Sequence, residues 1–96
     1  MTPEDILEQR IYDAFVRLDN AVDSACKMDV ARAADAICPV RERVDADSPA
    51  AQRLWEAERD LRRCVEFASP DEAVCHKDHV GKAARVARGA LREGLC

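Results

Sequence analysis

Residues 51–64 read AQRLWEAERDLRRC, and this stretch decides the fold because its helical pattern is the clearest in the chain. Ala51, Leu54 and Leu61 fall on one face of a helix, while charged side chains fill most of the positions between them. The stretch holds the only tryptophan, Trp55, and ends on Cys64. We predict that it forms the middle of a helix over residues 49–68.

Three dipeptides along the chain place a hydroxyl residue directly before a proline, at residues 2–3, 48–49 and 69–70. A hydroxyl oxygen at the N-cap accepts a bond from a backbone N–H that has no partner in the helix. Proline suits the next position, because the N–H that it lacks would go unsatisfied there. The pattern therefore predicts helices that begin at residues 3, 49 and 70.

These starts divide the chain into three predicted helices, over residues 3–44, 49–68 and 70–92. Pro39 predicts a break or kink near residues 37–40, because proline clashes with the carbonyl four residues before it. A second candidate break lies near residues 20–27. We therefore predict an all-α fold, a small antiparallel helical bundle of three main helices with the first broken into two, in a single helical domain over residues 1–96. The apolar positions predicted to face the core are Ile11, Phe15, Leu18, Val22, Cys26, Val30, Ala33, Ile37, Val40, Val44, Ala51, Leu54, Leu61, Val65, Ala68, Val74, Val80, Ala84, Ala87 and Leu91.

The composition predicts helices that pack closely through small side chains. Hydrophobic residues make up 48% of the 96 residues, but only 4% are aromatic, and alanine supplies much of the rest. The net charge of −4 is unevenly distributed, with −4 over residues 1–36 and +3 over residues 76–96. This gradient favours a basic last helix that packs beside an acidic first one. The alternative is an acidic surface that attracts a basic partner.

The sequence shows no sign of a membrane segment. No apolar run approaches the ~18 residues that a membrane span requires. The first residues, MTPEDILEQR, are acidic where a signal peptide would be basic and then apolar. We predict a cytoplasmic protein as the sequence is written, or a periplasmic or secreted one if a signal peptide was trimmed.

Five cysteines in 96 residues is a high content for a reduced cytosolic protein. Antiparallel packing places Cys26, Cys64 and Cys75 at one end of the predicted bundle, with His76 and His79 nearby. Three states fit this cluster. The first is a disulfide, with Cys26–Cys64 favoured; the second is buried free thiols; the third is a zinc ion held by Cys26, Cys64, Cys75 and His79.

The chain carries no signature of an enzyme, a cofactor site or a nucleic-acid interface. It has no glycine-rich phosphate loop, no H-E-x-x-H and no G-x-S-x-G. Basic residues recur on one side of the last helix, but the chain as a whole is acidic and the stripe lacks aromatic residues for base stacking. We predict a protein that is not an enzyme, has no cofactor and does not bind nucleic acid. The basic residues are Lys82, Arg85, Arg88 and Arg92.

The helix at residues 49–68 also carries charges spaced for pairing within the helix. Glu58 and Arg62 stand four residues apart, and Asp60 and Arg63 stand three apart. Such pairs contribute only about 0.2–0.5 kcal/mol each, so we predict that they mark a solvent-exposed face.

The spacing of Gln52, Trp55, Arg59, Asp60 and Cys64 resembles the closing motif of the LprI-like lysozyme-inhibitor family. Upstream, the pairs at residues 25–26 and 34–35 resemble the cysteine and the alanine-aspartate pair of that family, so the likeness covers about residues 25–67. The resemblance implies a non-enzymatic module that binds and inhibits a partner protein. We name Arg53, Trp55 and Arg59 as the residues that would contact this partner.

Two other functions fit the same residues. One is an intracellular, phage-encoded acidic helical inhibitor of a host defence or nucleic-acid enzyme, in the manner of anti-CRISPR proteins. The other is a zinc-binding or redox-sensing module built on Cys26, Cys64 and Cys75. The oligomeric state stays open, because an alanine-rich face with Ala83, Ala87 and Ala90 suits either a core or a dimer.

Overall fold

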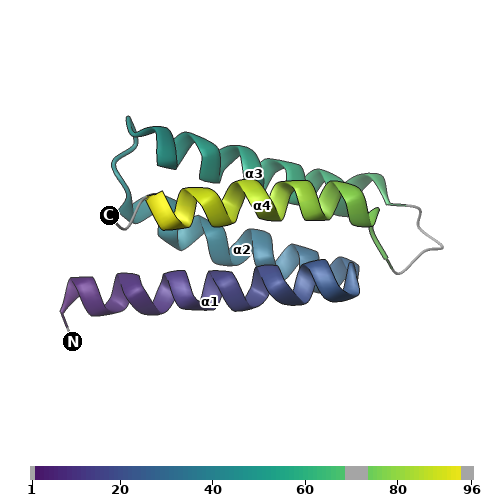
Figure 1. Cartoon of the computed structure of the whole chain (residues 1–96), viewed down its shortest axis with the longest axis horizontal. Coiled ribbons are helices and arrows are strands. Elements are labelled where there is room, and N and C mark those ends of the chain that lie inside the picture. Colours follow the sequence, from purple (N-terminus) through teal and green to yellow (C-terminus); the bar gives the residue numbers. More distant parts are fainter. Residues whose placement is uncertain (1, 69–73, 94–96) are drawn as a thin grey trace.

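The protein is an antiparallel bundle of four helices across the part of the chain that the structure describes (Figure 1). The structure is a computed structural model that describes residues 2–68 and 74–93. The helices are α1 (Pro3–Ser24), α2 (Lys27–Arg43), α3 (Pro49–Phe67) and α4 (Lys77–Glu93). Each helix packs on the next along the chain, and α1 also packs on α4 over a smaller area. The all-helical prediction is confirmed. Four helices are described where three main ones were predicted, because the predicted first helix is divided into α1 and α2.

The two helix starts that fall within residues 2–68 are confirmed. The Thr2 hydroxyl accepts a bond from the Asp5 amide at 3.2 Å, and the Asp5 carboxylate accepts one from the Thr2 amide at 3.4 Å. The Ser48 hydroxyl accepts a bond from the Ala51 amide at 3.2 Å. The third predicted start, at residues 69–70, lies outside the described residues. Helix α4 itself begins at Lys77, later than the predicted helix over residues 70–92.

The first predicted helix is broken at Ala25 and Cys26, which we call the elbow, and not near Pro39. Ala25 adopts the left-handed conformation, with φ 53° and ψ 14°, and its amide donates to the Ala21 carbonyl at 2.8 Å. Ser24 supports the turn, because its hydroxyl oxygen accepts a bond from the Cys26 amide at 3.1 Å and its O–H donates to Asp29 at 2.6 Å. The break therefore lies in the second candidate region, residues 20–27.

A break or kink was predicted near residues 37–40, but helix α2 runs through Pro39 without ending, so the chain is not broken there. Proline removes one backbone bond, to the carbonyl of Asp35, but it does not prevent helical backbone on either side. Ile37 and Val40 flank Pro39 and are 0% and 1% exposed. Most helical stability in proteins comes from such packing of the apolar face, and here the packing outweighs the lost bond.

The core consists of small aliphatic side chains from all four helices. Its largest fully buried members are Leu18, Ile37, Leu54, Leu61, Leu91, Val30, Val40 and Val80. Alanines fill the rest, among them Ala83, Ala87 and Ala90, so the alanine-rich face of α4 belongs to the core rather than to a dimer surface. Val74, a predicted core residue, is 47% exposed, because it precedes α4 in an extended segment beside the elbow.

The left-handed conformation of Ala25 predicts that its substitution by glycine costs less stability than the same substitution elsewhere in the core. Ala14 lies in the middle of α1 and is as fully buried as Ala25, at 0% exposure. Ala14→Gly should lower the free energy of unfolding by about 1.5–2 kcal/mol, through lost helix propensity and one lost buried methyl group. Ala25→Gly should cost at least about 1 kcal/mol less, because glycine adopts the left-handed conformation without strain. Urea unfolding of both variants measures the difference, and equal losses would contradict the strain at Ala25.

Candidate functional site

Trp55 and Arg59 lie one turn apart on the outer side of α3 and contact each other. Trp55 is 48% exposed, although large aromatic side chains usually bury most of their surface. The guanidinium carbon of Arg59 lies 5.2 Å from the centre of the tryptophan ring. Asp60 lies 3.5 Å from the same guanidinium group and helps to orient it. The result is a flat, exposed cation–π pair that is largely held in place before anything binds.

A surface hollow of about 520 Å³ lies beside Trp55. It is bounded by the end of α2, the connection to α3 and the first turns of α3. Residues of both charges line it, together with alanine and valine: Arg41, Glu42, Val44, Ala46, Asp47, Ser48, Ala51, Gln52 and Trp55. We call Trp55, Arg59 and this hollow the tryptophan face.

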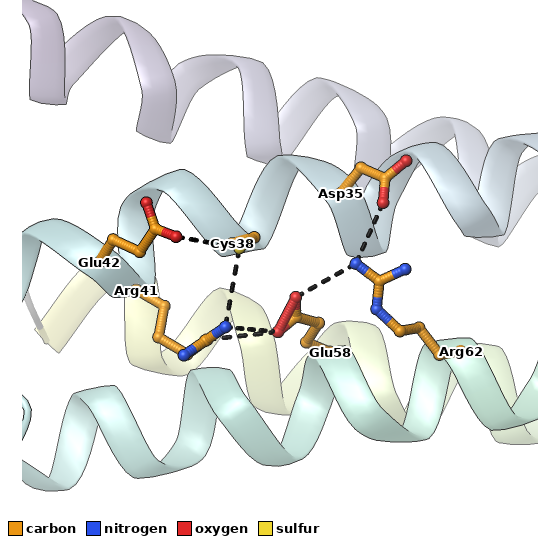
Figure 2. Close-up of polar contacts among 6 residues, drawn as sticks. All are labelled: Asp35, Cys38, Arg41, Glu42, Glu58 and Arg62. Carbon is orange, nitrogen blue, oxygen red and sulfur yellow. Dashed lines mark hydrogen bonds and ion pairs between the residues drawn. The ribbon is translucent and has the colours of Figure 1, made fainter.

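A buried carboxylate beneath this region joins α2 to α3 (Figure 2). Glu58 is only 6% exposed. One of its oxygens accepts a hydrogen bond from Arg41 Nε at 3.2 Å and forms an ion pair with Arg41 Nη2 at 3.1 Å. The other oxygen accepts a bond from Arg62 at 3.3 Å. Arg62 also donates to Asp35 at 3.0 Å. Glu58 thus holds charged groups from both helices at one position along the bundle.

The buried position of Glu58 corrects the sequence interpretation. The predicted Glu58–Arg62 pair forms, but it does not mark a purely exposed face. Asp60, which was predicted to pair with Arg63, lies instead beside Arg59. A signal for burial was present, because residues 51, 54, 58, 61 and 65 follow the three-four spacing of a single helical face. Glu58 occupies the centre of that face.

Cys38 extends the Glu58 network toward the tryptophan face, a contact that no pattern in the sequence predicts. Its sulfur lies 3.6 Å from Arg41 Nη2 and 3.6 Å from the Glu42 carboxylate, as Figure 2 shows. Burial raises the pKa of this thiol above its ordinary value of 9.0, and the charges of Glu58 and Glu42 raise it further. The thiol is therefore protonated near neutral pH and is a poor nucleophile.

Arg53 does not join the tryptophan face, although the sequence grouped it with Trp55 and Arg59. Its guanidinium group forms an ion pair with Glu93 of α4. Arg53 thus lies on the side of α3 that faces α4, whereas Trp55 borders residues of α2. The structure brings two of the three predicted contact residues together and assigns the third to the α3–α4 contact.

The elbow and the segment before α4 bring Cys26 and Cys75 to one end of the bundle. The Cys75 amide donates to the Ala25 carbonyl at 2.6 Å, and Cys26 forms an isolated backbone bridge with Val74. Cys64 lies close enough to interact electrostatically with Cys75. All three are free thiols, so the favoured Cys26–Cys64 disulfide is absent from the structure. Burial raises the pKa of both Cys64 and Cys75 above 9.0 and so favours the neutral thiol.

The zinc alternative gains no support from the geometry. Within residues 2–68 and 74–93, no group of three or more histidine, cysteine or acidic side chains is placed to hold a metal ion. His79 is exposed and packs edge-on against His76, with ring centres 4.6 Å apart. Both histidines line a groove of about 640 Å³ between the end of α3 and the start of α4, together with Cys64 and Phe67.

Comparison with protein-family models, with curated proteins and with solved structures finds no match to this chain. Among the helices described here, none is both long enough and apolar enough to cross a membrane.

The Glu58 network predicts an asymmetric response to the loss of acidic residues on α3. Glu58→Ala should lower the free energy of unfolding by about 3 kcal/mol, because it leaves Arg41 partly buried without its carboxylate. Glu66→Ala removes the same group from an exposed position of α3 and should change stability by no more than about 0.5 kcal/mol. Chemical unfolding measures both, and equal effects would contradict the bridging role of Glu58.

The thiols at the elbow end predict a loss of stability at alkaline pH. Because folding raises the pKa of Cys64 and Cys75 above 9.0, the folded chain holds these protons more tightly than the unfolded chain. Their contribution to stability is complete below pH 9 and is lost as the pH rises through the folded-state pKa values. Under reducing conditions, the unfolding free energy of the double variant Cys64→Ala, Cys75→Ala should fall less steeply than that of wild type as the pH rises above 9. Cys26→Ala is the control. If the unfolding free energy of wild type and of the double variant depended on pH in the same way, the role of Cys64 and Cys75 would be contradicted.

Proposed function

We propose that this chain is a non-enzymatic protein-binding module that inhibits its partner through the tryptophan face. The observation that carries the proposal is the half-exposed Trp55 with Arg59 held against its ring. Tryptophan and arginine are the residues most enriched among those that dominate binding energy at protein interfaces. An exposed pair of this kind makes little contribution to the bundle but offers a large contact area to a partner.

The surroundings of the pair support a binding role. The hollow beside Trp55 has room for a partner side chain and lies next to charges of both signs. The Glu58 network fastens α3 to α2 directly beneath, so the face loses little conformational freedom when a partner binds. Aromatic and arginine side chains are enriched at the centres of protein interfaces, and polar residues form the rim around them.

The cysteines support a function other than catalysis. A catalytic thiol needs a lowered pKa so that the thiolate is present near neutral pH. At Cys38, Cys64 and Cys75 the opposite holds, since burial raises the pKa of each thiol. Cys64 and Cys75 fit the role of small apolar side chains in the bundle, and Cys38 takes part in the Glu58 network.

The resemblance to LprI-like lysozyme inhibitors supplies the class of partner. Trp55, Arg59 and Asp60 of the shared motif are at least partly exposed on α3, and Gln52 lines the hollow. Motif residues that reach the surface favour recognition over packing. We therefore infer that a lysozyme-type muramidase is the first partner to test.

The proposal predicts inhibition of cell-wall lysis that depends on Trp55. The wild-type chain, titrated into lysis assays with animal, plant and phage lysozymes, should inhibit at least one of them. Trp55→Ala should weaken that inhibition by about tenfold or more, whereas Phe67→Ala, which removes an exposed aromatic residue from the other groove, should leave it unchanged. Unchanged lysis with the wild-type chain would remove lysozyme as the partner. Equal inhibition by wild type and Trp55→Ala would remove the tryptophan face.

A further inference from the structure

The outer side of α1 carries a continuous stripe of acidic and apolar residues. These residues recur at intervals of three and four, so they share one helical face, and every one of them is exposed. We call them the acidic stripe: Asp5, Glu8, Tyr12, Val16, Asp19 and Asp23. Tyr12 is 72% exposed and Val16 is 39% exposed, so an apolar centre lies between acids on both sides. None of these six residues belongs to the buried core.

The neighbouring helix α4 carries a face of opposite charge. We call Gly81, Lys82, Arg85, Arg88, Gly89 and Arg92 the basic stripe, since they lie on the side of α4 away from the core. A Cβ atom added at Gly81 or Gly89 would meet nothing within 4 Å inside this chain. Alanine would therefore fit at both positions and would favour the helix, so packing within one copy does not explain either glycine. Glycine on an outer helix face allows another backbone to approach closely.

One contact within the chain shows how the two stripes align. Arg88 of the basic stripe forms an ion pair with Asp19 of the acidic stripe. Because α1 and α4 run in opposite directions, Asp23 lies about level with Arg85, and Val16 lies about level with Arg92. Asp19 and Asp23 of α1 thus stand at about the same heights along the bundle as Arg88 and Arg85 of α4.

We propose that two copies of this chain form a symmetric dimer in which the acidic stripe of each copy packs on the basic stripe of the other. A two-fold axis parallel to the helices, between α1 and α4, places α1 of one copy over α4 of the second, and the reverse contact follows by symmetry. Rotation about that axis keeps every residue at its own height. Asp23 of each copy therefore faces Arg85 of the other, and the glycines allow α1 to approach.

Charge complementarity identifies the occupant of this surface as a second copy. Asp19 and Asp23 call for basic residues one turn apart on a partner helix, and Arg88 and Arg85 of α4 in a second copy lie at the required heights. A two-fold axis perpendicular to the helices would instead place α1 of one copy on α1 of the other. That arrangement sets acidic residues against acidic residues, which is unfavourable. The inference does not depend on the tryptophan face or on lysozyme.

Sedimentation of two complementary charge reversals tests the dimer. The wild-type chain should sediment as a dimer at low ionic strength and dissociate as salt screens the charges. Asp23→Lys and Arg85→Glu should each weaken the dimer about tenfold or more, because each sets like charges together at two symmetric positions. An equimolar mixture of the two variants should restore it, since lysine then faces glutamate and arginine faces aspartate. If a substitution acted only by disturbing its own chain, mixing the two variants would not restore the dimer.

Controls on α3 separate this interface from net charge. Glu66→Lys and Arg63→Glu change the charge by the same amounts at exposed positions of α3 and should leave the dimer intact. Gly89→Leu should weaken the dimer while the helical circular dichroism of the monomer stays at or above that of wild type. A wild-type chain that sediments as a monomer at every salt concentration would overturn the proposal, and so would a mixture no more associated than either variant alone. A monomer that binds basic peptides would point to a foreign partner instead.

Discussion

The hydrogen bond from the Cys75 amide to the Ala25 carbonyl, at 2.6 Å, is the constraint on which the rest of the bundle depends. It joins the connection between α1 and α2 to the segment that leads into α4. Ala25 accepts this bond while it holds a left-handed conformation that alanine otherwise avoids, and it is completely buried. The surrounding packing must compensate for that strain, and in return the two helical hairpins are fastened together at one end. The contact places Cys75 beside Cys26 at this end of the bundle.

Close packing through alanine makes polar contacts between helices unusually important here. Alanine lets helices approach, but each buried methyl group contributes only about 0.8 kcal/mol. Among the ion pairs described, the one centred on Glu58 is the most buried, and buried pairs fix geometry more than they stabilise. Glu58 therefore sets how α2 lies against α3, and this alignment is what places the hollow beside Trp55. Exposed pairs such as Arg53–Glu93 add little energy by themselves.

The sequence predicted what depends on local chemistry and missed what depends on tertiary contacts. The helix starts at Thr2 and Ser48 were predictable, because a cap needs only its own first turn. The break at Ala25 was predicted only as a second candidate region, residues 20–27, because no glycine marks it. The contact that stabilises it comes from Cys75, far along the chain. Pro39 gave a strong local signal that buried neighbours on α2 overcame. For the candidate site, the motif identified Trp55 and Arg59, but charge spacing alone could not show that Arg53 reaches across to α4.

The two proposed surfaces are compatible because they belong to opposite sides of one bundle. Helices α1 and α3 lie on opposite sides, each in contact with α2 and α4 (Figure 1). Trp55 borders residues of α2, so a dimer that covers α1 and α4 leaves the tryptophan face open on both copies. Such a dimer presents two identical faces that point away from each other. If the chain binds its target through the tryptophan face, this dimer would hold two separate target molecules rather than two sites on one monomer. A gain from two-site binding would then require a target that is itself multivalent or attached to a surface.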